Sequence, residues 1–303
     1  MTGLLAALVT SLFFPGIILR VKSIASGRKG PGILQPWKNI LLLLRKGSVF
    51  STVTGFVFRL APAVGLATVL CAILLVPFPG NPAAFSFAGD FIFLATLLAL
   101  GKFFLISSSL DTGSSFEGMG ASREALYSLL TEPAFIILFA TLALLTGENS
   151  MQEIFASLSF SGHLSFIIGF IAIYLLVQIA MIENSRMPVD DPKTHLELTM
   201  IHEVMILDHS GFDLALLHLA NTFKFALYGL LIANFLVPAD AAVAWRIAAF
   251  LGIQVTFAGM IGLMESFRAR KKLARNPQFI VTLSSIALVA FLLVMLIRFK
   301  MAV

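Results

Sequence analysis

The sequence has few charged residues and a single cysteine. Charged residues make up 12% of the 303 positions, whereas 58% are hydrophobic and the mean hydropathy is +0.96. Soluble globular proteins carry about 25% charged residues, so this balance excludes a soluble domain and indicates an integral membrane protein. Cys71 lies inside an apolar run, and we interpret it as a buried packing residue. One cysteine excludes a disulfide framework, an iron–sulfur cluster or a cysteine-ligated metal within this chain.

The sequence also lacks the features that divide a chain into domains. No like-charge run, low-complexity tract, Pro/Ser-rich linker or internal repeat interrupts it. We therefore predict a single integral membrane domain over residues 1–303. The first segment has neither the basic region nor the cleavage motif of a signal peptide, so we interpret it as a membrane helix.

Eight apolar runs are long enough to cross a bilayer. Each has roughly 18 to 23 residues, and about 20 helical residues cross a hydrocarbon core of about 30 Å. The predicted fold class is therefore an all-α, polytopic membrane protein with about eight transmembrane helices. The runs cover approximately residues 1–19, 60–79, 88–110, 124–146, 162–183, 214–237, 243–265 and 278–298.

Lysine and arginine are concentrated in alternate loops. Loops 20–59, 111–123, 184–213 and 266–277 carry eight, one, two and five of them, and the opposite loops 80–87 and 147–161 carry none. The positive-inside rule predicts that the basic loops lie in the cytoplasm and that both termini lie outside the cell inner membrane.

Loop 20–59 contains a second kind of helix signal. From Pro36 to Lys46, the residues Trp37, Ile40, Leu41 and Leu44 recur at helical spacing, with basic residues elsewhere. This pattern predicts a short amphipathic helix on the membrane surface. A solvated basic loop that contacts lipid phosphates is the alternative.

The stretch from Glu183 to Lys224 holds six carboxylates besides Glu183 between two apolar runs. Asp191 followed by Pro192 is typical of a helix start, and we predict a helix from about 192 to 207. His202 and Glu203 begin a zinc-type HExxH motif.

Ile206 occupies the position of the second histidine in that motif, and no cysteine completes a ligand set. We therefore interpret the histidines of this helix as solvated or hydrogen-bonded and predict no metal in this chain.

Charged residues also lie inside apolar runs. Lys102 is in the third run, Glu132 lies about 12 Å along a helix from Glu124, and Lys224 lies about 15 Å inside the sixth. An ionised residue at the middle of the membrane costs about 2.5–3.5 kcal/mol, so we expect each group to be paired, hydrated or protonated. Chains of carboxylates with an occasional lysine are what a proton path requires, although a buried Lys–Glu pair that only fixes helix packing fits too. On these grounds a generic transporter fits equally well.

The residues E183-N-S-R186-M-P188-V-D190 resemble the signature of a membrane subunit shared by respiratory complex I (its subunit 1) and the energy-converting nickel–iron hydrogenases. The eight apolar runs, the segment Arg28–Pro31 and the loop G120-A-S-R123-E124 agree with that family. In complex I, several glutamates usually follow the signature. The corresponding positions here are Lys193, His195 and Glu197, so only one acid is kept. The chain therefore looks more like the formate hydrogenlyase and hydrogenase-4 branch.

This resemblance implies a membrane anchor and coupling subunit that is not itself catalytic. Such a subunit links electron transfer in a peripheral arm to proton or sodium translocation. The implied partners are hydrogenase-type large and small peripheral subunits, antiporter-like membrane subunits and membrane lipid, with no nucleic acid. The nickel–iron and iron–sulfur centres are expected in those partners, and no cofactor is expected in this chain.

The resemblance and the ionisable pattern together give two sets of candidate residues. The expected proton path comprises Glu124, Glu132, Glu183, Glu197, Glu203, Asp213, Lys224 and Glu265. The expected interface with the peripheral arm comprises Arg28, Lys29, Arg123, Arg186, Asp190 and His195.

Two alternatives stay open. A quinone-binding subunit of a complex I-like NADH:quinone oxidoreductase requires a tunnel that opens between the first span and the amphipathic helix. A stand-alone ion transporter requires transport by the isolated chain.

Overall fold

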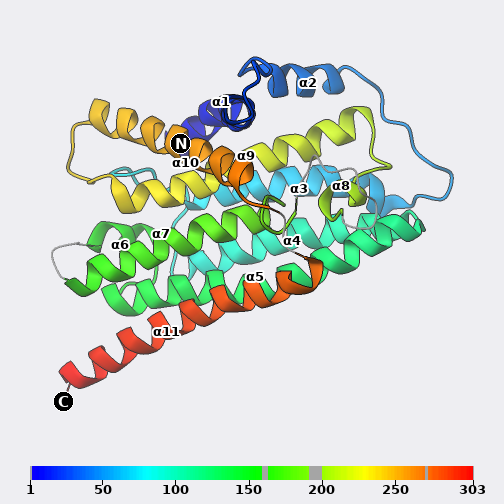
Figure 1. Cartoon of the computed structure of the whole chain (residues 1–303). Coiled ribbons are helices and arrows are strands. Elements are labelled where there is room, and N and C mark those ends of the chain that lie inside the picture. Colours follow the sequence, from blue (N-terminus) through cyan, green and yellow to red (C-terminus); the bar gives the residue numbers. More distant parts are fainter. Residues whose placement is uncertain (1, 159–162, 191–199, 270–271, 303) are drawn as a thin grey trace.

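The computed structural model describes residues 2–158, 163–190, 200–269 and 272–302, and within these ranges it is built from helices without a named strand (Figure 1). In chain order the elements are α1 (Thr2–Ala25), α2 (Gln35–Leu44), α3 (Phe56–Leu75), α4 (Asp90–Asp111), α5 (Ser115–Thr146), α6 (Met151–Ser157), α7 (His163–Glu183), α8 (His202–Met205), α9 (Gly211–Leu236), α10 (Val243–Phe267), the 3-10 turn η1 (Leu273–Arg275) and α11 (Asn276–Ala302).

Eight of these helices are long and apolar enough to cross a membrane, which confirms the predicted fold class. They are α1, α3, α4, α5, α7, α9, α10 and the segment of η1 and α11. The chain is thus a multi-pass, all-α membrane protein.

Helices α7 and α9 form the centre of the bundle. In the most apolar window of α9, 78% of the residues are buried, and in that of α7, 61% are buried. Helix α9 packs against α1, α2, α3, α7 and α10, whereas α5 packs against α4, α7, α8 and α11. Helix α11 lies at the edge of the bundle along α5 (Figure 1).

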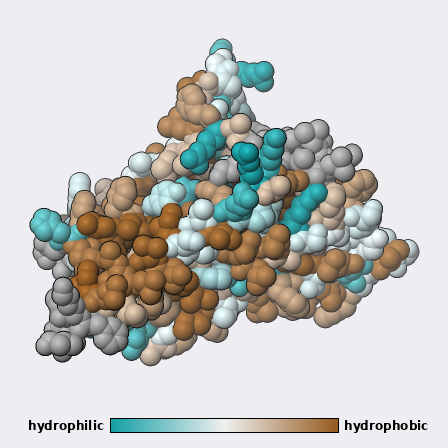
Figure 2. Space-filling model, turned by 60° about the horizontal axis from the view of Figure 1, so that its bottom comes forward, coloured by the Kyte–Doolittle hydropathy of each residue, from teal (hydrophilic) through white to brown (hydrophobic). Residues whose placement is uncertain are grey.

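The outer helices present large apolar side chains to their surroundings. Phe103, Leu129 and Phe170, for example, are exposed on α4, α5 and α7. On the face shown in Figure 2, hydrophobic residues cover a broad area and hydrophilic residues gather in a group beside it. In a membrane protein such outward apolar positions contact lipid rather than the core.

Cys71 is also exposed, on α3, so its interpretation as a buried packing residue is wrong.

The connections α1–α3, α4–α5, α7–α9 and α10–α11 lie at one end of the bundle, and we call this end the basic face. Hydrogen bonds join the α1–α3 connection to the α7–α9 connection and to the end of α4. The Val49 amide donates to Ser210 Oγ at 2.9 Å, and the Gly55 amide donates to Asp111 Oδ2 at 2.7 Å. These bonds satisfy backbone groups that have no partner inside a helix.

Helix α5 begins earlier than the sequence predicted. Residues 111–123 were expected to form a loop, but only Thr112–Ser114 separate α4 from α5. Gly113 has φ +68° and makes the turn. Gly120 lies inside α5, where the absence of a side chain allows Val204 and the Ile201 carbonyl to approach closely. Gly113 and Gly120 were both predicted to be loop residues, but Gly120 lies in a helix and allows a neighbouring segment to pack closely.

The amphipathic helix is present as α2, beside α9 and α1 (Figure 1). Ile40 of the predicted apolar stripe is buried, whereas Leu41 is exposed. The short helix α6 was not predicted, and its first turn is capped by Ser150 Oγ, which accepts from the Glu153 amide at 3.3 Å.

Half of the helix predicted over 192–207, residues 192–199, lies outside the described residues. In the described part, only His202–Met205 is helical. Ile201 has φ −124° and ψ −75°, which no helix continues through. Packing of Ile201 and Val204 on Gly120 holds the chain in this short turn, so the prediction is wrong for this part.

Candidate functional site

A buried lysine joins three helices near the centre of the bundle. Lys102 Nζ of α4 lies 2.9 Å from Glu124 Oε1 of α5 and 2.9 Å from Glu183 Oε1 at the end of α7. Only 5–6% of these three side chains is exposed. A buried charge is stable when partners compensate it, so each of the three charges depends on the others.

Lys224 of α9 completes this group. Its Nζ lies 4.0 Å from Glu183 Oε2 and donates to the Glu183 carbonyl at 3.4 Å. This is the carboxylate or polar environment that its depth in the apolar run predicts. We call Lys102, Glu124, Glu183 and Lys224 the lysine–glutamate cluster; two positive and two negative charges balance within it when all four groups are ionised.

Two small cavities adjoin the cluster on different sides. One, of about 50 Å³, is lined by the whole cluster together with His202 and Asn221. The other, of about 20 Å³, is lined by Lys102, Glu183, Glu132 and Tyr228, among others. A water molecule needs about 10–15 Å³ of such space and two to four polar partners. Both cavities therefore have room for water, and the second brings Glu132 to the cluster.

A third, larger cavity of about 320 Å³ lies between α1, α2 and α9. Pro15 lines it from α1, and Ile40 lines it from α2. Its polar lining includes Arg186 and Glu203, and it shares His202 and Asn221 with the 50 Å³ cavity. The three cavities are therefore separated only by shared wall residues along a line from Glu203 past Lys102 to Glu132.

The segment 184–190, which carries most of the sequence signature, is held from several helices. Asn276 Nδ2 of α11 donates to the Val189 carbonyl at 3.0 Å. Asp190 Oδ2 accepts from the His202 amide at 3.2 Å, which fixes the segment to α8. We call residues 184–190 the signature loop. Glu183 lies directly before this loop, so the position of the loop limits where Glu183 can lie.

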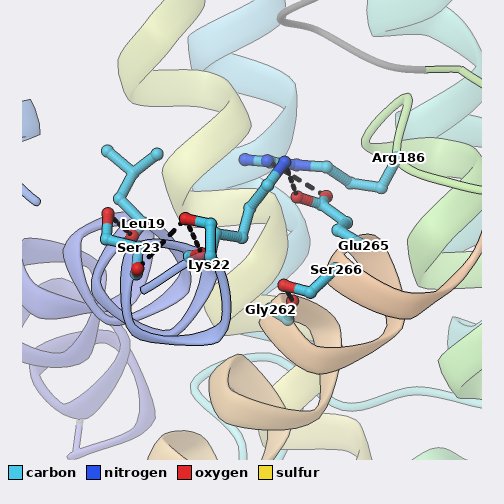
Figure 3. A network of polar contacts seen from close by, with 8 residues as sticks. Leu19, Lys22, Ser23, Arg186, Gly262, Glu265 and Ser266 are labelled. Atoms are coloured by element: carbon cyan, nitrogen blue, oxygen red, sulfur yellow. Dashed lines mark hydrogen bonds and ion pairs between the residues drawn. The ribbon is translucent and has the colours of Figure 1, made fainter. Parts of the chain in front are cut away.

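Glu265 lies in a different group. Its Oε2 is 2.7 Å from Lys22 Nζ, and its Oε1 is 3.2 Å from an Arg186 guanidinium nitrogen. Figure 3 shows the two cations pointing at this carboxylate from α1 and from the signature loop. The sequence grouped Glu265 with the proton-path residues, whereas the structure brings it together with Arg186, one of the expected interface residues.

The remaining predicted residues are spread over the basic face. Arg123 Nη1 donates to the Met200 carbonyl at 2.9 Å, and the Asp213 amide donates to Ser48 Oγ at 3.2 Å. Arg28 and Lys29 are exposed. His195 and Glu197 lie outside the described residues.

Two histidines of the α7–α9 connection have displaced pKa values. Burial, together with Lys224 and other nearby positive groups, lowers the pKa of His202 to about 3. Burial lowers the pKa of His209 to about 4, and its ring stacks on Phe58 with centroids 4.0 Å apart. Both imidazoles are therefore neutral near pH 7.

The candidate residues chosen from the sequence did not include Lys102, Asn221 or Tyr228. Lys102 carried the same signal as Lys224, a lone lysine inside an apolar run. Asn221 and Tyr228 are recognised only through the cavities that they line. Among the described residues, no group of three or more His, Cys, Asp or Glu side chains is arranged to hold a metal ion.

Comparison with known proteins gives a consistent set of relatives. The family model described as NADH dehydrogenase matches residues 1–301. The chain is 34% identical over 209 residues to hydrogenase-4 component C of Escherichia coli K12, which covers 69% of this chain and 65% of that protein. It is 35% identical over 139 residues to formate hydrogenlyase subunit 4 of the same organism, covering 46% of this chain and 45% of that protein. The matched segments thus span less than two thirds of these two relatives' own lengths.

More distant matches cover more of the chain. A subunit of the NADH-quinone oxidoreductase of Bacillus cytotoxicus is 25% identical over 277 residues, covering 81% of this chain and 80% of that protein. A chain in the structure of a membrane-bound sulfane sulfur reductase, an archaeal respiratory membrane complex, superposes with a TM-score of 0.80 at 18% identity, covering 97% of this chain and 100% of that chain. This last likeness concerns the fold.

Proposed function

The chain belongs to the NADH dehydrogenase family, that of complex I subunit 1, and we propose that it is the membrane anchor and coupling subunit of an energy-converting nickel–iron hydrogenase or hydrogenase-related complex. In this role it links electron transfer in a peripheral arm to proton or sodium translocation. The hydrogenase branch is favoured because the relatives named as hydrogenase-4 and formate hydrogenlyase subunits are 34% and 35% identical, against 25% for the NADH-quinone oxidoreductase subunit.

The observation that carries this proposal is the lysine–glutamate cluster with its adjoining cavities. Ionisable residues inside membrane helices are costly, and they are retained mainly where ions move or substrates bind. The 320 Å³ and 50 Å³ cavities share His202 and Asn221, and the 50 Å³ and 20 Å³ cavities share Lys102 and Glu183. Water in these spaces would connect Glu203 to Glu132 through groups that can accept and release protons.

The proposed chemistry uses only side chains that hold and pass protons. Glu183 lies between Lys102 and Lys224, so a displacement of the signature loop that follows it would move its carboxylate relative to both lysines. Glu124 is held by the same lysine, Lys102, which links its position to that of Glu183. A redox event that displaces the signature loop would therefore change proton occupancy in the cluster.

The partners follow from the same proposal. The basic face would dock a peripheral arm of hydrogenase-type large and small subunits, which would hold the nickel–iron and iron–sulfur centres. Exposed Arg28 and Lys29, together with Arg123, Arg186, Asp190 and His195, would form part of that junction. Antiporter-like membrane subunits would contact the lipid-facing helices. In this arrangement the basic face would lie in the cytoplasm, and both termini would lie outside the cell inner membrane.

Purification of the chain from its native membranes under mild conditions tests the proposal. We expect a hydrogenase-type large subunit and antiporter-like subunits to co-purify, with iron, acid-labile sulfide and nickel in the complex. A large subunit without nickel-ligating cysteine pairs would keep the hydrogenase-related assignment and exclude a hydrogenase. Ion transport by the isolated chain after reconstitution would instead favour a stand-alone transporter and contradict the proposal.

One observation favours a second candidate, a quinone-binding subunit. The 320 Å³ cavity lies between α1 and α2, where a quinone tunnel would open, and ligand pockets have volumes of about 300–1,000 Å³. Quinone-dependent activity of the purified complex would support this candidate if Asn39→Trp, which fills the cavity wall, abolished it. Lys38→Trp, on the exposed surface of the same helix, is the matched control.

A further inference from the structure

Glu265 belongs to an ion-pair group that is separate from the lysine–glutamate cluster. Its side chain has no exposed surface, and each of its two carboxylate oxygens has a cation of its own. Each cation compensates the charge of this buried carboxylate, so removal of either one would leave part of that charge uncompensated. Glu265 does not line any of the three cavities that adjoin Glu203, the lysine–glutamate cluster and Glu132.

Arg186 connects this carboxylate to the rest of the bundle. Its guanidinium lies over the Phe225 ring of α9, 5.1 Å from the ring centre, and its side chain also lines the 320 Å³ cavity. Its amide donates to the Met181 carbonyl of α7 at 2.7 Å, and its carbonyl accepts from the amides of Val189 and Asp190, each at 3.2 Å. Arg186 therefore attaches the signature loop to α7, α9 and α10.

The ion pair between Glu265 and Arg186 connects the signature loop to a helix outside the loop. Lys22, Glu265 and Arg186 come from α1, α10 and the loop, and Figure 3 shows them meeting at one carboxylate. The loop begins directly after Glu183, whose carboxylate pairs with Lys102. A force that holds Arg186 in place consequently also limits where Glu183 can lie.

We propose that Glu265 is a positioning residue, which holds the signature loop through Arg186, rather than a member of the proton path. Its effect on ion movement rests on the proposed function, whereas its effect on the loop does not. Lys22 has a lesser part, because it neutralises Glu265 from α1 but makes no contact with the loop among the interactions of the described residues.

Thiol labelling of the loop tests this proposal in the assembled complex. In a Cys71→Ser background, Ser185→Cys places a single thiol in the loop at a position that is 4% exposed. We expect Glu265→Gln to raise the rate of maleimide labelling about tenfold or more, because removal of one partner of a buried ion pair leaves the other charge uncompensated. Arg186→Gln should have a similar effect. The double variant should label no faster than the faster single variant, because both changes remove one interaction.

Two control variants should raise the labelling rate less than Glu265→Gln or not at all. Lys22→Met should raise the labelling rate less than Glu265→Gln, because the pair with Arg186 remains. Glu153→Gln, an identical chemical change at an exposed position on α6, should leave labelling unchanged. If Glu265→Gln does not assemble, Glu265→Asp replaces it and should show an intermediate rate, because its shorter side chain reaches both cations less well.

Unchanged labelling in the Glu265 variant, or additive effects in the double variant, would overturn the proposal. Loss of ion movement in Glu265→Gln without faster labelling would return Glu265 to the proton path. An unmodified complex that moves no ions would contradict the proposed function but would leave the labelling comparison valid.

Discussion

Lys102 Nζ and Glu183 Oε1 lie 2.9 Å apart, although the two residues belong to helices that are not neighbours in the chain order, α4 and α7. The same lysine nitrogen lies 2.9 Å from Glu124 Oε1. One cation therefore holds two carboxylates within the membrane-spanning part of the bundle. This relationship makes the three residues interdependent, both for stability and for any proton that passes among them.

Replacement of Lys102 by methionine should destabilise the chain strongly. It leaves Glu124 and Glu183 buried without their shared cation, and breaking a buried ion pair from one side costs about 3–5 kcal/mol. Thermal unfolding of the purified complex measures the effect. The double variant Lys102→Met, Glu124→Gln should be less destabilised than Lys102→Met alone, because it buries one negative charge fewer. Equal or greater destabilisation of the double variant would contradict the proposed compensation.

Replacement of Gly120 by alanine should weaken the contact between α5 and α8. A side-chain carbon at this position would meet the Ile201 carbonyl oxygen at 2.8 Å, and overpacking of this kind costs about 1–3 kcal/mol. Gly118→Ala is the matched control, since its nearest neighbour, Leu110 Cδ2, is 4.0 Å away. We expect a lower unfolding temperature for Gly120→Ala and an unchanged or higher one for Gly118→Ala. Equal effects at the two positions would argue against the close approach at Gly120.

His209 should make stability depend on pH below neutrality. Its pKa is lowered to about 4 in the folded state by burial, against about 6.5 when unfolded. Between these values the unfolded state binds more protons, so the stabilisation is complete above pH 6.5 and decreases by about 3 kcal/mol as the pH falls towards 4.

His209→Phe should remove this contribution. A phenyl ring keeps the stacking on Phe58 and eliminates two ring nitrogens that have no hydrogen-bond partner among the described residues. We expect the unfolding temperature of the variant to fall less than that of the wild type between pH 7.5 and pH 5. Identical pH profiles for the two proteins would contradict this role of His209.

The sequence predicted the fold well because hydropathy over a span is a sum over many residues. All eight spans were identified, since the ~30 Å hydrocarbon core requires long apolar helices whatever their packing. The start of α5 was missed because Gly113 and Gly120 give the same local signal. Gly113 makes a turn with φ +68°, whereas Gly120 admits a neighbouring chain inside a helix, and only the tertiary contact distinguishes them.

The site was predicted in part for a similar reason. Lone charges within apolar runs identified Glu132 and Lys224, and the signature identified Glu183. The ion pairs of Lys102 with Glu124 and Glu183 could not be predicted, because the sequence does not show how α4, α5 and α7 are aligned relative to one another. Glu265 was therefore grouped with the carboxylates of the path, although its contacts are with Lys22 and Arg186.

The central claim is that the chain couples electron transfer to ion movement through the lysine–glutamate cluster and Glu132. It is tested most directly in membrane vesicles that contain the complete complex, by the number of ions moved per electron transferred. Glu132→Gln removes the carboxyl group that lines the 20 Å³ cavity and has no ion pair to break among the described residues. We predict normal assembly and electron transfer but a lower ratio of ions to electrons in this variant, with no change in Glu153→Gln. An unchanged ratio in Glu132→Gln would contradict the account.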